Sequence, residues 1–474
     1  MSRPAVSAAA GSDATASPPL RFALAALVAG LLAAMLLPRA PAGLGYAVVA
    51  VALALAAALA VRPARPARSA LLAALALALA ASAGVRDAGW VVAGELVAAV
   101  VLGSLAMSAP RTWRGSVLGA AAAPLRMVSG ARLVAVAVAS TPPHGPSRQA
   151  FALGRALLLT GVLLAVFGAL FASGDRAFAQ IAGDVLPDEL PLDDLPLRLF
   201  VLGAVVSLAG GFAQAARTGD GPARRPLLRL GHTEWLLALG ALNALFAVFV
   251  AVQLAVLFGG DAYVRDSAGL TYAQYAREGF AQLVVVAALT LAVVAGALRW
   301  ARTENVRQAC ILRALLGALC LLTLVVLASS LHRLGLYEQA YGFTRARLAV
   351  HGLLLFGGAL FALVVAALAI DRRGWLAQAT VLLAATAALL FWVSDPDRRI
   401  AAHNVERYEL TGKIDTRYLA DLSADAVPAL MGLPAPLREQ SVGPQRARLA
   451  AEADGLAGAN LARSRARQLL GARR

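Results

Sequence analysis

Carboxylate, arginine and tyrosine side chains that could take part in chemistry gather in four short clusters of this chain. The clusters span residues 167–178, 258–280, 329–347 and 395–430. Such groups at one surface would suit an enzyme acting on a lipid-linked envelope substrate, or a surface that docks a partner. The candidate functional residues in them are Asp175, Tyr272, Tyr275, Arg277, Arg333, Tyr337, Tyr341, Asn404, Arg407, Tyr408 and Asp425.

Three further polar residues lie inside long apolar stretches. Glu95 is about one and a half helical turns from the outer end of its stretch. A carboxylate buried in a membrane is costly, so Glu95 is either functional or, as we expect, close enough to the interface to reach water. Asn243 and Gln253 would lie about 80° apart on one helix. They either line one polar seam or, as such residues more often do, hydrogen-bond to neighbouring helices.

The chain carries no recognisable catalytic or ligand-binding motif. P-loop, HExxH and GxSxG patterns are missing, and no GxGxxG follows a strand. His332, His351 and His403 lack the spacing of metal ligands. Cys310 and Cys320 would be about 15 Å apart along one helix, too far for a disulfide. The sequence predicts no cofactor and no metal site.

The elements that must position these residues are membrane helices. Of the 474 residues, 60% are hydrophobic and 15% charged, which leaves too little polar surface for a water-soluble fold. The composition therefore predicts an all-α, polytopic integral membrane bundle of about 11 transmembrane helices (about 10–12). The apolar stretches are 22–37, 44–61, 69–85, 90–109, 151–171, 198–216, 234–258, 280–298, 308–330, 346–370 and 375–393.

Arginine and lysine are distributed unequally between alternate loops. Seventeen lie in loops 62–68, 110–150, 217–233, 299–307 and 371–374. Seven lie in loops 38–43, 86–89, 172–197, 259–279 and 331–345. The positive-inside rule places the richer set in the cytoplasm, so the net charge of +16 indicates membrane topology and not nucleic-acid binding. With eleven spans, the N-terminus is cytoplasmic and the C-terminus extracytoplasmic.

Two segments next to the spans each fit two alternative readings. Residues 1–42 are a retained first helix with its tail or, alternatively, a cleaved secretory signal, and either leaves the remaining topology unchanged. Residues 110–150 mix apolar and basic side chains, which is typical of a helix lying in the membrane interface or of an ordinary basic linker.

The region after the last span changes character midway. Gly412 is a predicted helix stop and Asp415 and Ser423 are predicted N-caps, which indicates a small helical extracytoplasmic cap. The following Ala- and Arg-rich tail is a solvated helix or disordered. The predicted domains are the cytoplasmic tail 1–21, the bundle 22–393, the cap 394–432 and the basic tail 433–474.

Tyrosine is concentrated on the outer side. Seven of the eight tyrosines lie in the outer clusters, whereas an aromatic belt would also place tyrosines at the inner face. We therefore expect the four clusters to pack into one cap over the bundle. Within it, Arg277 and Arg333 should pair with outer-loop carboxylates, because a partly desolvated cation needs a partner.

The outer clusters also carry a family resemblance. The residues that carry it are Gly269–Tyr272, Tyr275–Arg277, Gly279-Phe280, Leu336-Tyr337, Ala340–Gly342, Thr344, Asn404, Arg407-Tyr408, Tyr418-Leu419 and Leu422–Pro428. By these residues the chain resembles the bacterial domain-of-unknown-function family 4173, kin of family 4153, over roughly residues 90–430, with departures at Gly174 and Asp395. The resemblance implies a multi-pass protein of the bacterial inner membrane without an established activity, and it supplies no catalytic residues.

Three functions fit these features. They are a non-catalytic envelope or signalling partner, a solute or lipid permease, and an enzyme acting on a lipid-linked envelope substrate. A closed bundle would favour the partner and a polar cavity at the midplane the permease. An outer cleft joining Asp175, Arg277 and Asn404 would favour the enzyme. The expected partners are the lipid bilayer and an envelope protein or lipid-linked molecule, and not nucleic acid.

The charge bias and the odd number of spans predict an extracytoplasmic C-terminus. Alkaline phosphatase fused after Arg474 should therefore be active, because the enzyme folds only outside the cytoplasm, where its disulfides form. The activity is measured in intact cells against a fusion placed in loop 299–307, which should be inactive. An inactive C-terminal fusion would mean that a span is miscounted or the orientation reversed.

Overall fold

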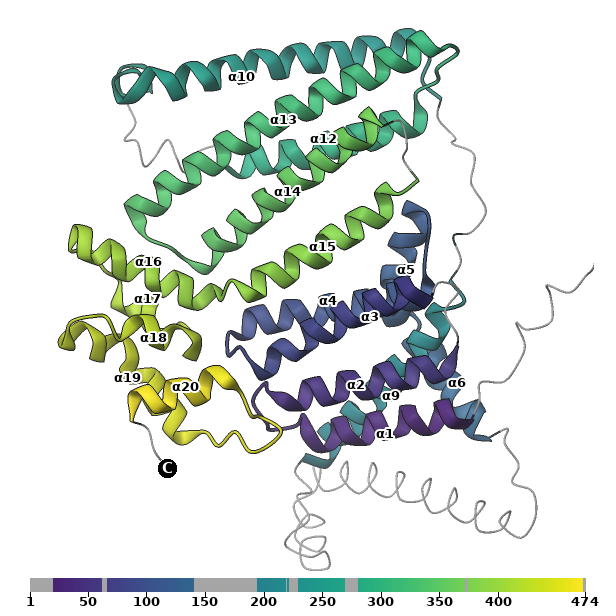
Figure 1. Cartoon of the computed structure of the whole chain (residues 1–474), viewed down its shortest axis with the longest axis vertical. Helices are drawn as coiled ribbons and strands as arrows, with labels where there is room; N and C mark the ends of the chain where they lie inside the picture. The colour runs from purple at the N-terminus through teal and green to yellow at the C-terminus, as the bar shows by residue number, and fades with distance from the viewer. Residues whose placement is uncertain are drawn as a thin grey trace, which may run out of the picture.

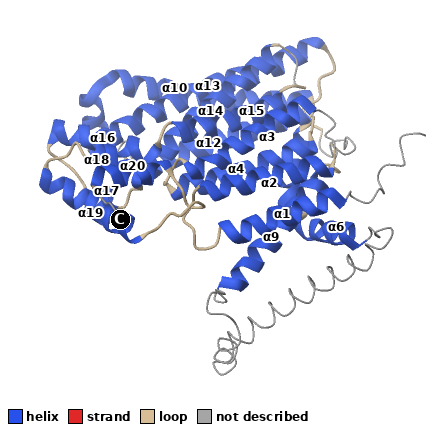
Figure 2. Cartoon of the chain, turned by 60° about the horizontal axis from the view of Figure 1, so that its bottom comes forward, coloured by secondary structure: helices blue, strands red, loops and turns tan. Residues whose placement is uncertain are grey.

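A computed structural model describes residues 20–61, 66–139, 194–218, 220, 229–268, 280–370 and 374–471. Across these residues the chain consists of helices and connecting turns, with one isolated bridge between Leu230 and Ala301 and no strand. Figure 2 shows the helices running through the whole described chain. The predicted all-α class is confirmed, and the helices are compatible with a polytopic membrane bundle.

Ten helices coincide with ten of the predicted spans. Eight are long and apolar enough to cross a membrane, whereas α1 and α2 have 17 residues each, at the lower limit for a span. The predicted span 151–171 lies outside the described residues. The ten are α1 (Leu20–Leu36), α2 (Leu44–Ala60), α3 (Pro66–Ala81), α4 (Gly89–Ser108), α9 (Leu195–Ala215), α10 (His232–Ala268), α12 (Phe280–Trp300), α13 (Val306–Tyr341), α14 (Arg345–Ala369) and α15 (Leu376–Val393).

The helices lie side by side in two halves joined by α15 (Figure 1). One half contains α10, α12, α13 and α14 around buried Leu316, Leu319 and Phe361. The other half contains α1 to α4 and α9. Between them, Ala385 of α15 packs with Leu79 of α3 and other buried side chains of α3 and α4. The core of the bundle is therefore several apolar clusters, one for each group of neighbouring helices.

Residues 113–139 form two short helices, α5 (Trp113–Leu125) and α6 (Met127–Ala139), which bend by 61° at Arg126. The bend follows Pro124, whose ring disfavours a continuing helix. Gly130 crosses α9 so closely that a Cβ built on it would lie 2.3 Å from the backbone nitrogen of Gly211. Residues 113–139 of segment 110–150 are thus helical, and the bent pair together is long and apolar enough to form one broken membrane span, which neither reading of the segment expected.

Two helices are much longer than their predicted spans. α10 has 37 residues and α13 has 36, or about 55 Å of helix against about 30 Å of hydrocarbon. The prediction that 259–279 and 331–345 are loops is therefore wrong for residues 259–268 and 331–341. In α13 the continuing residues are mostly good helix formers, and the helix ends only where Gly342 adopts a positive φ of 80°.

The C-terminal residues form a compact helical cap at one end of the bundle (Figure 1). Gly412 ends α16 with a φ of 67°, and the Asp415 carboxylate caps α17 by accepting from the Tyr418 N–H at 2.9 Å. Ser423 precedes η4 but makes no side-chain cap. The cap elements are α16 (Pro396–Thr411), α17 (Thr416–Ala420), η4 (Ala424–Ala426), α18 (Val427–Leu430), α19 (Ala435–Ala451) and α20 (Leu461–Leu470).

The basic tail belongs to the same hydrophobic core as the rest of the cap. Val442, Leu449 and Ala466 of this tail are buried with Ile400 and Leu419 of the earlier cap helices. The expectation of a solvated or disordered tail is therefore wrong over residues 435–470. The sequence of α20 does not reveal this, because the helix also carries three arginines and buries one of them, Arg463.

That buried charge is Arg463, which is 2% exposed. Its guanidinium donates to Asp87 at 2.7 Å and to Asp454 at 2.8 Å, and to the Ala42 carbonyl oxygen at 2.9 Å. Asp87 lies in the α3–α4 turn and Ala42 in the α1–α2 turn. One arginine near the end of the chain therefore holds two turns of the bundle.

Replacing Arg463 by alanine should destabilise the cap by about 3–5 kcal/mol, because Asp87 and Asp454 lose a buried partner. Thermal unfolding and limited proteolysis of the purified protein measure the effect. Arg465→Ala, at an exposed position on the same helix, is the matched control and should change the melting temperature little. Equal stability of the two variants would contradict the role given to Arg463.

Candidate functional site

The cap contacts the bundle at the turns that the charge pattern predicts to be on the outer side. The backbone N–H groups of Leu44 and Gly45, at the start of α2, donate to Ala459 and Ala457 of the cap. The α3–α4 turn, the α13–α14 turn and the end of α15 also meet it, as Figure 1 shows. These outer turns, distant in sequence, thus share one end of the molecule.

The first polar centre of this joint is Asp397, whose side chain is fully buried. It accepts hydrogen bonds from the Arg345 guanidinium at 3.1 and 2.6 Å, from the Trp90 indole at 3.0 Å and from the Ser423 N–H at 2.9 Å. Burial alone would raise the pKa of Asp397, but these donors and the Arg345 charge hold it below its ordinary value. Asp397 is thus an ionised structural acceptor that joins α4, α14 and the cap.

The residue two positions earlier, Asp395, has a left-handed backbone with a φ of 53°. This conformation is unfavourable for a residue with a Cβ and is kept only where its surroundings impose it. Pro396 follows as the first residue of α16, and the Asp395 carboxylate lies 2.5 Å from the Arg86 guanidinium. The α15–α16 turn is therefore fixed by an ion pair to the α3–α4 turn.

The second polar centre is Asp425, which is 4% exposed. Its carboxylate accepts from the N–H groups of Asp87 and Ala88 at 2.8 and 2.9 Å and from the Ser423 hydroxyl at 3.1 Å. Burial and the charge of Asp395 raise the pKa of Asp425 to about 6. Arg86 opposes this only weakly, because it is 3.7 Å from Asp425 and much closer to Asp395.

A small cavity of about 30 Å³ lies between these groups. Its charged lining is Arg86, Asp395, Arg398, Asp425 and Arg465. The volume is close to that of one water molecule and too small for an organic substrate. Among the described residues, no group of three or more His, Cys, Asp or Glu side chains could hold a metal ion.

Two of the predicted site residues serve the joint itself. Asn404 donates to the Phe343 carbonyl oxygen at 3.0 Å and accepts from the Phe343 N–H at 3.2 Å. Arg407 donates to the carbonyl oxygens of Gln339 and Ala340 at 3.0 and 2.6 Å, near the C-terminal end of α13. Both side chains bind backbone, so they hold α16 against α13 and leave little capacity for a ligand.

Two predicted tyrosines form a partly exposed aromatic group nearby. The rings of Tyr337 and Tyr341 are 4.9 Å apart, and the Arg347 guanidinium lies 4.3 Å from the Tyr337 ring. Tyr341 is 55% exposed, and Leu410, one turn along α16 from Arg407, is 81% exposed. We call Tyr337, Tyr341, Arg347 and Leu410 the outer patch. Tyr408, by contrast, packs partly buried against the cap core.

The predicted intramembrane residues connect helices in pairs. Asn243 of α10 donates to the Leu315 carbonyl oxygen of α13 at 3.2 Å. Gln253 accepts from the Ser329 hydroxyl at 3.3 Å and from the Arg333 guanidinium. Of the two readings for Asn243 and Gln253, the structure therefore favours interhelical hydrogen bonds.

Glu95 does not reach the surface of the protein. It is 4% exposed and both carboxylate oxygens are buried without a hydrogen-bond partner among the described residues, near the Ser82 hydroxyl and the Arg86 charge. The expectation that Glu95 reaches water is therefore wrong, because the turn η2 (Ser82–Gly84) packs beside α4 and covers it.

Four of the predicted residues, Asp175, Tyr272, Tyr275 and Arg277, lie outside the described residues. The cleft expected to join Asp175, Arg277 and Asn404 is therefore not tested, nor is the pairing expected for Arg277. Arg333 binds Gln253, as described above. The cap does gather the tail with residues of the 331–345 segment, as expected for two of the four clusters.

Sequence reasoning missed the residues that dominate the joint: Asp87, Arg345, Asp397 and Arg463. Each lies at the end of an apolar stretch or in the basic tail, where charges serve topology and solubility in most membrane proteins. A possible signal was the acid directly after Pro396, since an acid in the first turn of a helix is stabilised by the helix dipole.

Comparison with known protein families identifies the chain. A model described as a domain of unknown function, DUF4153, matches residues 71–433. The chain belongs to this family. The match begins in α3 and ends in the cap, so it includes most of the joint, while the related family 4173 is not confirmed. Searches of the curated proteins and of the solved structures found no match to the chain.

Asp425→Asn should stabilise this DUF4153 protein at neutral and alkaline pH. The folded protein binds the Asp425 proton up to about pH 6, whereas the unfolded chain releases it near pH 4. The cost of ionising the buried group is therefore absent below about pH 4 and grows to about 3 kcal/mol above pH 6. Asparagine removes this cost and keeps an oxygen for the Asp87 and Ala88 N–H groups.

The measurement is the melting temperature of both proteins between pH 4.5 and 8. The difference between Asp425→Asn and the parent protein should increase with pH over this range. Asp421→Asn, at an exposed position of the same cap, should show a difference that does not vary with pH. If the melting-temperature difference for Asp425→Asn were also constant with pH, the raised pKa of Asp425 would be contradicted.

Proposed function

We propose that this DUF4153 protein is a non-catalytic envelope partner of the bacterial inner membrane, whose extracytoplasmic cap presents the outer patch to another envelope protein. The observation that carries the proposal is the Tyr337–Tyr341–Arg347 group, in which Tyr341 is exposed, together with exposed Leu410 on α16, the helix that Arg407 binds to the end of α13. Tyrosine and arginine are the residue types enriched in the centres of protein interfaces.

The polar groups of the joint support a structural role more than catalysis. Asp397, Asn404 and Arg407 are occupied by several hydrogen bonds each, and the cavity beside Asp425 is about the size of a water molecule. An enzyme needs a site where a substrate atom contacts such groups. In the described part of the chain, the cap residues contact one another instead.

The cavity expected for a solute permease would be polar. The large cavity of the bundle is instead apolar, with Tyr46 and Ser69 as its polar lining residues. The Ser69 hydroxyl already donates to the Ala106 carbonyl oxygen at 2.6 Å. This favours the envelope partner over a permease for polar solutes.

The test is complementation of a deletion strain. The deletion should raise the sensitivity of cells to detergent, and the parent gene should restore resistance. Leu410→Glu, which places a charge in the outer patch, should fail to restore resistance at normal protein level. Leu456→Glu changes a leucine that is 90% exposed elsewhere on the cap and should restore it.

Full resistance with Leu410→Glu, or no sensitivity in the deletion strain, would contradict the proposal. Accumulation of a lipid-linked envelope precursor in the deletion strain would favour the enzyme instead. Protein levels are compared by immunoblot, because a variant whose cap does not fold would also fail to restore detergent resistance.

A further inference from the structure

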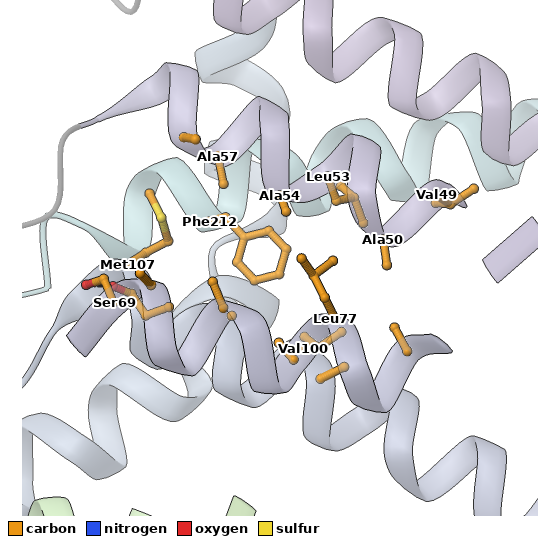
Figure 3. A pocket seen from close by; sticks show the side chains of 18 of the residues that line it. Val49, Ala50, Leu53, Ala54, Ala57, Ser69, Leu77, Val100, Met107 and Phe212 are labelled. Atoms are coloured by element: carbon orange, nitrogen blue, oxygen red, sulfur yellow. Dashed lines mark hydrogen bonds between the residues drawn. The ribbon is translucent and has the colours of Figure 1, made fainter. Parts of the chain in front are cut away.

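A large cavity lies within the described part of the bundle. It has a volume of about 370 Å³ between α2, α3, α4 and α9. Figure 3 shows Phe212 of α9 pointing into it between Leu53, Leu77 and Val100. This volume falls in the range of small-molecule sites, about 300–1,000 Å³.

The cavity exists because its walls are made of small side chains. Ten of its lining residues are alanines, and Gly103 lies so close to the Phe212 ring that an added Cβ would be 3.0 Å from it. α2 packs mainly on α1, whereas α3 packs mainly on α4. The seam between these two helix pairs is therefore left partly open, although the Phe212 ring of α9 enters it.

The cavity has the shape of a slot along the helices. On α2 its lining runs from Tyr46 to just beyond the helix at Val61, and on α3 from Pro66 to Ala80. At 1.5 Å per residue these stretches are about 21–22 Å long, a large part of the hydrocarbon thickness of about 30 Å. A ligand that fills the slot must be long, thin and apolar.

The mouth of the slot faces an apolar surface. Leu55, Leu59 and Leu71 of α2 and α3 are 60%, 37% and 48% exposed, and they lie in predicted spans. Lining residues Ala58 and Ala70 are exposed as well. Since all five lie in helices predicted to cross the membrane, we expect this side of the slot to face lipid.

We propose that this slot binds one hydrocarbon chain of a bilayer phospholipid. Apolar cavities of about 150 Å³ already stay dry and bind small hydrocarbons. An α-helix of a partner protein is about 10–12 Å across with its side chains, so a helix of this length needs several times the volume. Burial of the chain's methylene groups against the alanine walls supplies the binding energy, by close packing. This site is independent of the proposed docking of the cap.

The test uses the full chain in phosphatidylcholine vesicles that contain a phospholipid with a photoreactive diazirine in its acyl chain. After illumination, mass spectrometry should find adducts on the lining residues Met107 and Phe212 well above those on Leu245. Leu245 is 64% exposed on α10 and reports ordinary surrounding lipid.

Ala54→Trp places an indole in the slot and should reduce the Met107 and Phe212 adducts about tenfold, the effect of about 1.4 kcal/mol. Ala74→Trp, at an exposed position of α3 that does not line the slot, is the matched control and should leave them unchanged. Circular dichroism and melting temperature establish that both variants fold, and Ala54→Leu replaces Ala54→Trp if the indole prevents folding. The proposal would be overturned if Met107 and Phe212 carried no more adducts than Leu245. It would also be overturned if their adducts stayed at the parent level in the folded Ala54 variant.

Discussion

The Asp87 carboxylate is the contact on which the outer half of the molecule most depends. It lies in a short turn between two apolar helices, and its side chain is 8% exposed. It accepts from Arg463 at 2.7 Å, from Arg448 at 2.6 Å and from the Ala424 N–H at 3.0 Å. A buried carboxylate is tolerated only with charged partners and full hydrogen bonding. The last two helices of the chain supply both arginines, so burial of Asp87 requires the C-terminal cap to be in place.

Such polar joints have a particular value in a membrane bundle. Helices in lipid gain no hydrophobic free energy by associating, because lipid chains are as apolar as leucine. The two halves here share the limited α15 interface and are connected outside the hydrocarbon by Asp397, which binds Arg345 of one half and Trp90 of the other. The cap thus fixes the relative position of the two halves at one end, through directional hydrogen bonds to Asp397.

The proposed docking surface and the proposed lipid slot both lie between elements that the cap contacts hold in place. The outer patch is rigid because Arg407 holds the end of α13. The slot lies between α2 and α3, and the cap fixes both helices at their outer ends through Leu44 and through the α3–α4 turn.

The sequence by itself determined the helical class, ten of the spans that the structure describes, and the alternation of turns that brings the predicted outer loops to one end. These follow from local causes: an apolar stretch of about 20 residues must form a helix in lipid, and Gly412 and Asp415 end and start helices by their own geometry. Only the tertiary structure decided that the basic tail is part of the cap, that Glu95 is covered, and that Asn404 and Arg407 bind backbone. Each of these depends on contacts between residues far apart in sequence, such as Arg463 with Asp87. A charge in a short turn or a basic tail has the same local appearance whether water or a buried partner satisfies it, so its role is set by the assembled fold.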